Sequence, residues 1–514
     1  MDPRHLGSLL DDAARLHGDR PFLRDERTCF TYVELASASR RLGGWLAGQG
    51  LRRGDRAVIL TRNRVEVALA AFATARIGGA FTVLHGGLRE AGLRRILAQV
   101  TPAVAFLDES TAHLASAFEG VPIVWVGGGA VPATGHGLER ILETGRAECP
   151  PFTGVDVDPV CLVYTSGSTG APRGVTLSHD NILFVVAAIQ ARLQYTREDV
   201  VGVFLPLSFD YGLYQVFLAA QVGATVFVGG AELAGPALVT TLERQRVTVL
   251  PGVPTLFAAL LKLLERRGAG GLRLRALTNT GAHLPSGHVA LLRQRLPGVA
   301  VFPMYGLTEC KRVSILLPEE VEAHPGSVGR ALPGTEAMIL DEEGRELPPG
   351  EVGELVIQGR HVALGYWGAP EETALRYRLH PRGLGRVLYS GDLFRMDAEG
   401  FLQFVGRKDF LLKRRGFRLH PLEIEDVACA LPGVAEAGVV QEADSDRLHL
   451  FVTATGGPDA PPGREAGVLD ALASRLEAHK VPDRVHWVPE LPRTPNGKLD
   501  RAALSTWVER GGRS

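Results

Sequence analysis

Short apolar runs alternate with amphipathic segments along the chain up to about residue 300. The apolar runs predict strands at 57–60, 80–84, 104–107, 161–164, 247–250 and 274–278. The segments with helical periodicity predict helices at 65–77, 93–100, 238–245 and 254–264. Strands that alternate with helices indicate parallel sheets covered by helices, so we expect an α/β fold.

The pattern changes after about residue 335. Strands expected at 354–358 and 402–405 are separated by glycines and prolines, which predicts a β-rich subdomain at about 335–405. A compact α+β segment follows, with a helix at 422–430 whose Glu423, Glu425 and Asp426 are expected to face outward. Because 514 residues exceed the size of a single core, we expect an N-terminal domain at 1–406 and a small mobile C-terminal domain at 407–514.

Composition and charge exclude several classes of protein. The net charge of −1 argues against a broad surface for nucleic acid. The five cysteines are scattered without a C-x-x-C pair, which argues against a disulfide framework or a zinc site. The N-terminus lacks the regions of a signal peptide, and polar residues and Pro206 interrupt the apolar stretch at about 200–230. We therefore expect a cytoplasmic protein without a membrane span.

Residues 164–175 read Tyr-Thr-Ser-Gly-Ser-Thr-Gly-Ala-Pro-Arg-Gly-Val. Hydroxyl groups and the backbone N–H groups that glycines expose suit a polyphosphate. The run does not match the Walker A pattern. A loop of this composition is either a phosphate-binding loop or an ordinary connection, and the rest of the chain has to decide between them.

Several motifs in a fixed order favour the phosphate-binding interpretation of this loop. They are Phe-Thr-Tyr-Val-Glu-Leu at 30–35, Ala-Arg-Ile-Gly-Gly-Ala at 75–80, the loop at 164–170, Tyr-Gly-Leu-Thr-Glu at 305–309, Gly-Glu-Leu at 353–355, Tyr-Ser-Gly-Asp-Leu at 389–393, Gly-Arg-Lys-Asp at 406–409 and Pro-Asn-Gly-Lys-Leu-Asp at 495–500. Over nearly its full length the chain resembles the adenylate-forming enzymes, which include acyl-CoA synthetases, adenylation domains of nonribosomal peptide synthetases and luciferases.

The resemblance implies a reaction with two anionic reactants. A carboxylate attacks the α-phosphorus of ATP and expels pyrophosphate, so the site must neutralise charge and align both groups. Glu309 would help to hold Mg²⁺, Thr308 would contact the α-phosphate, Tyr305 would stack on adenine and Asp392 would bind the ribose. The residues implied to bind ATP are Thr165, Ser166, Gly167, Ser168, Thr169, Gly170, Arg173, Gly281, Ala282, Tyr305, Gly306 and Asp392. Arg173 stands where the family often has lysine, and a cation is kept. His283 is expected to be structural or peripheral.

The C-terminal motifs imply the catalytic cation and the hinge. Lys498 would bridge the substrate carboxylate and the α-phosphate as negative charge builds. Arg407 would contact ribose or phosphate, and Asp409 would be the hinge about which the C-terminal domain rotates between adenylation and transfer. A basic cluster of Lys413, Arg414, Arg415 and Arg418 is either a solvated face or a contact for the phosphates of coenzyme A or of a carrier's phosphopantetheine.

By the same resemblance, the acid pocket is expected to begin at the motif at 205–212. Its implied lining is Phe209, Asp210, Tyr211, Tyr214, Thr278, Thr280 and Met304. Such a lining suits a modest, mostly apolar acid. Asp210 matches the position that pairs with the α-ammonium in amino-acid-activating members, but similar sequences occur in ligases without an amino substrate. An amino acid therefore remains one possibility.

The acceptor is also open at this point. No carrier-protein segment follows Lys498 in this sequence, so we expect transfer to a free partner: coenzyme A, a separate carrier protein or a small amine. An acid–thiol ligase is the first interpretation and an amide-forming ligase the second. A non-catalytic nucleotide-binding protein is disfavoured because Lys498, Glu309 and Asp392 are all present.

Overall fold

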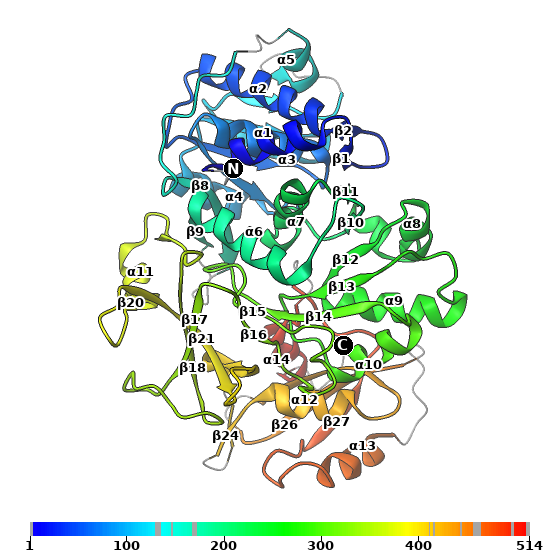
Figure 1. The fold of residues 1–514 in the computed structure, drawn as a ribbon. Coiled ribbons are helices and arrows are strands. Elements are labelled where there is room, and N and C mark those ends of the chain that lie inside the picture. Colours follow the sequence, from blue (N-terminus) through cyan, green and yellow to red (C-terminus); the bar gives the residue numbers. More distant parts are fainter. Residues whose placement is uncertain are drawn as a thin grey trace.

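The computed structural model describes residues 4–128, 135–144, 148–166, 172–410, 412–414, 417–442, 445–455, 464–494 and 498–509. Two large sheets dominate the N-terminal part (Figure 1). The first has the order β16-β15-β14-β13-β12-β10-β11-β1-β2, with a parallel centre from β14 to β1. Its strands are β1 (Pro21–Arg24), β2 (Cys29–Thr31), β10 (Val200–Val203), β11 (Thr225–Val228), β12 (Val249–Gly252), β13 (Ala276–Asn279), β14 (Ala300–Tyr305), β15 (Ser314–Ile315) and β16 (Arg330–Ala331).

The second sheet has the order β19-β9-β8-β4-β3-β5-β6-β7. It is parallel from β8 to β7, and β9 pairs antiparallel with both β8 and β19. Its strands are β3 (Arg56–Leu60), β4 (Ala80–Leu84), β5 (Val104–Leu107), β6 (Ile123–Trp125), β7 (His136–Gly137), β8 (Pro159–Ser166), β9 (Pro172–Ser178) and β19 (Gly365–Tyr366). The α/β fold expected from the alternating pattern is confirmed.

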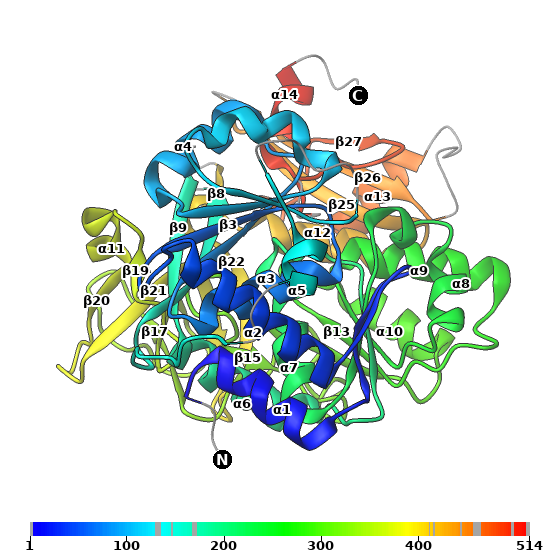
Figure 2. The same cartoon turned by 90° about the horizontal axis from the view of Figure 1, so that it is seen from above.

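Helices fill the space around and between these sheets (Figures 1 and 2). Every residue of α3 is buried, and nearly every residue of α7. A helix that is buried all round must lie inside the domain, and both helices contribute to one large apolar core. The helices are α1 (Leu6–His17), α2 (Tyr32–Gly48), α3 (Val65–Arg76), α4 (Glu90–Val100), α5 (Leu138–Thr144), α6 (His179–Leu193), α7 (Asp210–Val222), α8 (Leu238–Arg244), α9 (Pro254–Arg267) and α10 (Ser286–Arg295), with 3-10 segments η1 (Glu109–Phe118) and η2 (Ala231–Ala234).

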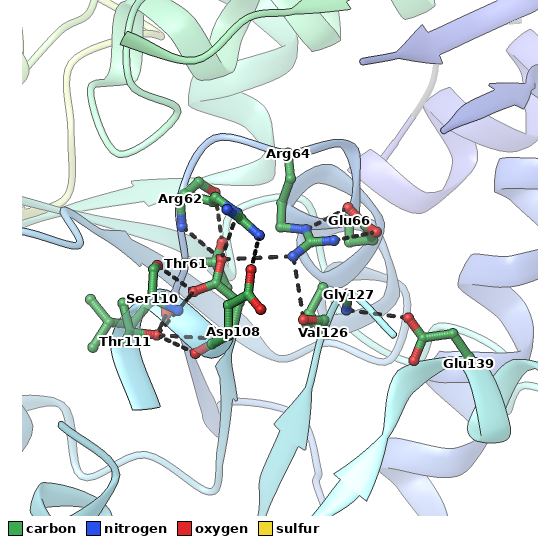
Figure 3. A network of polar contacts seen from close by, with 12 residues as sticks. Thr61, Arg62, Arg64, Glu66, Asp108, Ser110, Thr111, Val126, Gly127 and Glu139 are labelled. Carbon is green, nitrogen blue, oxygen red and sulfur yellow. Dashed lines mark hydrogen bonds and ion pairs between the residues drawn. The ribbon is translucent and has the colours of Figure 1, made fainter. Parts of the chain in front are cut away.

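A polar network fixes the ends of β3 and β5 (Figure 3). The Asp108 carboxylate accepts hydrogen bonds from the backbone N–H groups of Arg62 (3.1 Å) and Ser110 (3.0 Å). It also lies 3.7 Å from Nη1 of Arg64, which pairs with Glu66 at 2.8 Å. Because each charge in the network has a partner, this arrangement is structural rather than a candidate site.

The β-rich subdomain is an antiparallel sheet with the order β17-β18-β21-β20, and β22 also pairs with β21. The elements are β17 (Thr335–Leu340), β18 (Val352–Gly359), α11 (Pro370–Arg376), β20 (Tyr377–Leu379), β21 (Arg386–Met396) and β22 (Leu402–Arg407). The register of β21 and β22 places Asp392 opposite Arg407. Two residues implied for nucleotide binding are therefore neighbours in the sheet.

The C-terminal segment has its own apolar core, separate from the N-terminal one. It comprises η3 (Lys408–Phe410), β23 (Leu412–Arg414), β24 (Phe417–Leu419), α12 (Pro421–Cys429), β25 (Val434–Gln441), β26 (Leu448–Ala454), α13 (Arg464–Ala473), β27 (Arg484–Trp487) and α14 (Arg501–Glu509). Figure 1 shows this segment below the first sheet, with α12 beside α10, and Nε2 of His288 lies 3.1 Å from the Ala435 carbonyl oxygen across that boundary.

Two expectations for the C-terminal segment were wrong. Glu425 does not face outward: it is buried, binds Arg501 through both carboxylate oxygens (2.6 and 2.8 Å) and accepts from the Val439 N–H. Arg414 is not free for a phosphate, because it is 3% exposed and forms a bidentate pair with Asp483 at 2.7 and 2.8 Å. A single sequence shows neither partner, since both lie far along the chain.

Most predicted boundaries agree with the structure. The strands at 80–84 and 104–107 match β4 and β5, and the helix at 65–77 ends one residue earlier, at Arg76. The strand expected at 247–250 starts later, at Val249. The reason is that the Val247 N–H bonds the Leu242 carbonyl oxygen at 3.0 Å, so Val247 closes the C-terminal turn of α8 instead of joining the sheet.

Candidate active site

The carboxylate of Asp392 is held between two side chains. The Tyr305 hydroxyl donates to its Oδ2 at 2.6 Å, and Nε of Arg407 lies 3.2 Å from its Oδ1. Burial raises the pKa of Asp392, while Arg407 and the Tyr305 hydrogen bond act in the opposite direction. The Tyr305 ring packs edge-on against Phe394, with ring centroids 4.5 Å apart. Three residues implied for nucleotide binding or catalysis thus form one contact group.

Glu309 is oriented by a residue that the sequence analysis missed. The Tyr366 hydroxyl donates to Glu309 Oε1 at 2.7 Å, and the Glu309 carbonyl oxygen accepts from the Ala363 N–H at 2.8 Å. The guanidinium carbon of Arg173 lies 5.7 Å from the centroid of the Tyr366 ring. Tyr366 therefore lies between Arg173, next to the loop at 165–171, and the Glu309 carboxylate. Its place in Gly-Tyr-Trp at 365–367 gave only a weak signal.

The turn that carries Thr308 and Glu309 depends on a glycine. A Cβ at Gly306 would lie 2.0 Å from the Lys311 carbonyl oxygen, which no larger residue tolerates. Thr308 lies half-buried in this turn between β14 and β15, and Ala282 lies half-buried in the turn after β13. The chain therefore passes close to itself where the implied phosphate and metal residues stand.

Lys498 contacts Thr494 and is influenced by charges from distant parts of the chain. Thr494 and Lys498 exchange backbone and side-chain hydrogen bonds, Thr494 N to Lys498 O at 2.8 Å and Lys498 N to Thr494 Oγ1 at 3.2 Å. Although part of the residue is exposed, surrounding protein atoms desolvate the ammonium and lower its pKa. Asp210, Asp392 and Glu309 favour its charged form, and Arg407 opposes it. The C-terminal lysine thus shares its electrostatic surroundings with the implied ribose, metal and acid residues.

The expected acid-binding residues come together around the N-terminus of α7. The Tyr211 hydroxyl contacts Thr278 at both its carbonyl oxygen (2.7 Å) and its Oγ1 (2.6 Å). Burial raises the pKa of Tyr211 to about 12. Gly281 has φ +88°, and a Cβ there would lie 3.1 Å from Cζ of Phe209. The remaining expected residues, Tyr214, Thr280 and Met304, are also buried.

Two buried cations in this region were not predicted. Lys311 and Arg312 are 4% and 2% exposed. Nζ of Lys311 lies 3.2 Å from Asp210 Oδ2 and 4.4 Å from the centroid of the Tyr214 ring. The expectation of a mostly apolar lining did not include these charged groups. The signal was present in the sequence as a Lys-Arg pair in the run Cys-Lys-Arg-Val-Ser-Ile-Leu-Leu at 310–317, because charged residues are rarely buried in such runs unless they are paired.

His283, in the turn after β13, contacts the C-terminal segment. Its Nε2 lies 3.1 Å from Oδ1 of Asp426 on α12. This contact agrees with the structural role expected for His283. Asp409, the expected hinge, is exposed in η3 and lies 3.9 Å from Nη2 of Arg407.

Part of the expected phosphate loop lies outside the described residues. Thr165 and the backbone of Ser166 end β8, opposite Arg173 and Pro172 of β9. Gly167, Ser168, Thr169 and Gly170 lie outside the described residues, as do Arg415 and the side chains of Lys413 and Arg418.

The described residues contain neither a helix that could span a membrane nor a cluster of metal ligands. None of their helices is long and apolar enough to cross a membrane. No group of three or more His, Cys, Asp or Glu side chains among them is arranged to hold a metal ion. A single carboxylate suits Mg²⁺ that is bound mainly through substrate phosphates, and the Glu309 carboxylate is held by the Tyr366 hydroxyl.

Family models match most of the chain. The model for AMP-binding enzymes matches residues 10–367, and the model for the C-terminal domain of AMP-binding enzymes matches residues 423–498.

Individual relatives cover nearly the whole chain. An L-proline–[L-prolyl-carrier protein] ligase of Streptomyces coelicolor is 31% identical over 96% of this chain and 94% of its own length. A feruloyl-CoA synthase of an Amycolatopsis species is 30% identical over 97% of this chain and 98% of its own. The solved complex of VinN with L-aspartate is 34% identical, with a TM-score of 0.70 over 79% of this chain and 100% of that chain.

Proposed function

The chain belongs to the family of AMP-binding enzymes, and on this premise we propose how its residues activate an acid and to which acceptor they pass it. It is an ATP-dependent, AMP-forming acyl-adenylate ligase. In the first step an oxygen of the acid's carboxylate attacks the α-phosphorus of ATP, and the bond to the leaving pyrophosphate breaks. The product is the mixed anhydride of the acid and AMP.

The nucleotide would lie along the contact group of Asp392, Tyr305 and Arg407. Asp392, fixed by Tyr305 and Arg407, accepts hydrogen bonds from the ribose hydroxyls. Tyr305 offers its ring to adenine beside Gly281 and Ala282. Thr308, Arg173 and the motif residues at 165–170 would bind the phosphates. Glu309 would hold Mg²⁺, which would neutralise phosphate charge.

Lys498 would act on the reacting atoms. A compact ammonium between the substrate carboxylate and the α-phosphate stabilises the negative charge that builds as the new bond forms. The observation that supports this role is the set of charges around Lys498: Asp210, Asp392 and Glu309 all raise its pKa against the effect of burial. These carboxylates are the ones assigned to the acid, ribose and metal parts of the proposed site, which supports a role for Lys498 at the reacting atoms.

We propose a thiol on a phosphopantetheine arm as the acceptor, in coenzyme A or on a separate carrier protein. Its sulfur attacks the acyl carbonyl carbon, loses its proton and expels AMP. One 31% identical relative is a carrier-protein ligase and another at 30% is a CoA synthase, which supports a thiol over an amine. The C-terminal domain, 407–514, would rotate about Asp409 to exchange Lys498 for a second face during transfer.

The acid itself is proposed to be small and polar. VinN, at 34% identity, has been solved with L-aspartate, and the buried Asp210–Lys311 pair makes this region polar. Both observations favour a polar acid over the mostly apolar acid expected from the sequence.

The test is a set of incubations with ATP, Mg²⁺, a panel of small acids and one acceptor at a time. The acceptors are coenzyme A, a phosphopantetheinylated carrier protein and a small amine, and products are identified by mass spectrometry. Acid-dependent AMP with an acyl thioester supports the proposal. An amide formed at a higher rate than any thioester would replace it with the amide-ligase alternative.

A further inference from the structure

Arg312 is a buried cation that lacks a counterion within the described part of the chain. It is 2% exposed and is among the largest fully buried side chains. Its Nε and Nη1 have no hydrogen-bond partner among the described residues, and none of these residues forms an ion pair with it. Buried charges in proteins are normally paired and hydrogen-bonded, so two unused N–H donors on a buried guanidinium point to a missing anion.

Arg312 lies among the acid-binding residues. Its guanidinium carbon is 5.3 Å from the centroid of the Tyr211 ring. The Tyr211 hydroxyl in turn contacts Thr278, and both residues were expected to contact the acid. The ring face offsets part of the cost of burying the cation, but a ring satisfies none of the in-plane N–H donors.

Burial lowers the pKa of Arg312 and the charge of the Asp210 carboxylate opposes this shift, but Asp210 is already paired. Asp210 Oδ2 lies 3.2 Å from Nζ of Lys311, and Asp210 is 6% exposed. This buried region thus has one carboxylate and two cations, Lys311 and Arg312. Lys498, the third cation nearby, is assigned to the reacting carboxylate. The count leaves one buried positive charge for the substrate to neutralise.

We propose that the acid carries a second carboxylate, which Arg312 binds through its free N–H donors while the first carboxylate reacts beside Lys498. The planar guanidinium fork matches the two oxygens of a carboxylate, which a point cation does not. The substrate class is therefore a short dicarboxylic acid. Because Asp210 already has a partner, an amino group on the acid is not required by the charge count. The inference rests on the proposed adenylation.

Matched acids test the inference with the wild-type enzyme. Acid-dependent ATP–pyrophosphate exchange is measured for butanoate against succinate, pentanoate against glutarate, and 2-aminobutanoate against aspartate. We expect at least one dicarboxylate to exceed its monocarboxylate partner by about 100-fold or more in kcat/KM, the size expected for a buried charge pair. Equal or higher kcat/KM for the monocarboxylate in all three pairs would overturn the inference.

Variants of Arg312 test whether this residue causes the preference for dicarboxylates. Arg312→Met keeps most of the volume and removes the charge, and we expect it to lose the dicarboxylate preference while keeping exchange with the monocarboxylate. Arg345→Met is the matched control, because Arg345 is an exposed arginine of the β-rich subdomain; it should keep the wild-type preference. Equal losses for both members of a pair in Arg312→Met would assign Arg312 a structural role and overturn the inference.

The outcomes separate the inference from the proposed function. Exchange with monocarboxylates alone rejects the second carboxylate but keeps adenylation. No exchange with any acid in a broad panel rejects the adenylation itself. If Arg312→Met does not fold, the wild-type comparison still decides, and Arg312→Lys, which keeps the charge without the fork, should retain only part of the preference.

Discussion

Asp210 and Lys311 form a buried ion pair, with Oδ2 and Nζ 3.2 Å apart. Asp210 begins α7, and Lys311 follows the turn that carries Glu309. The pair therefore links the acid-binding helix to the turn assigned to the phosphates and the metal. It also occupies the one carboxylate that the sequence offered as a partner for an amino group.

The pair should show strong coupling in stability. Asp210→Asn leaves Lys311 as a buried cation without its partner, so we expect the free energy of unfolding at pH 7 to fall by about 3 kcal/mol. The double variant Asp210→Asn, Lys311→Met should recover most of this loss. Urea unfolding of the two single variants and the double variant gives the coupling energy. Additive effects would show that the two side chains do not interact.

The pH dependence of stability should report on Lys311. Burial lowers its pKa from 10.5 to about 8, although Asp210 opposes the shift. The unfolded chain therefore binds more protons between these values, and stability from this group rises as the pH rises from about 8 to 10.5. Lys311→Met should lack this part of the rise. Identical profiles of unfolding free energy for variant and wild type would contradict the assignment.

Removal of the Lys498 ammonium should impair chemistry more than nucleotide binding. We expect Lys498→Ala to lower the rate of acid-dependent pyrophosphate exchange by at least about 100-fold. The dissociation constant for ATP should change much less, because Asp392, Tyr305 and Arg407 remain. Lys262→Ala, at an exposed position on α9, is the control. A comparable exchange rate in Lys498→Ala and wild type would refute the role of Lys498.

The rate should also depend on the protonation of Lys498. Its pKa is lowered from 10.5, mainly by burial, and the charged form is the active one. Exchange should therefore fall as the pH rises through a value below 10.5. In Lys498→Arg the cation stays protonated, and any remaining activity should lack this alkaline limb. A limb that is unchanged in Lys498→Arg would belong to another group.

The contact between His283 and Asp426 should favour the observed arrangement of the two parts of the chain. We expect Asp426→Asn to slow adenylation by a few-fold. Thioester formation from a supplied acyl-adenylate should not fall with it, because the proposed rotation about Asp409 gives transfer the other orientation. Glu423→Gln on the same helix, which removes a pair with Lys480 within the C-terminal segment, should leave both half-reactions unchanged. An equal slowing of both half-reactions by Asp426→Asn would indicate general destabilisation.

The fold class and the family resemblance could be predicted from the sequence because both depend on local patterns. Strand and helix periodicity located β4, β5 and α3 closely, and Tyr305 and Asp392, which the resemblance assigned to one nucleotide, are in contact. Glycines such as Gly306 were informative for the same reason, since a close backbone approach excludes other residues.

The sequence did not predict partners that tertiary packing creates. The Lys311–Asp210 pair, the Tyr366–Glu309 hydrogen bond and the Glu425–Arg501 pair each join residues far apart in the chain. A charged residue next to apolar residues can be solvated or buried with a partner, and the pattern is the same in both cases. The Lys-Arg pair at 311–312 was visible in the sequence, but the pairing of Lys311 with Asp210 became evident only from the structure.

The central claim is that the acid's own oxygen bonds to the α-phosphorus of ATP. The most direct measurement uses an acid that supports exchange, labelled with ¹⁸O in its carboxylate, and follows the products by mass spectrometry after acyl transfer. The account predicts one labelled oxygen in AMP and none in pyrophosphate. Unlabelled AMP, or formation of ADP and orthophosphate in its place, would contradict it.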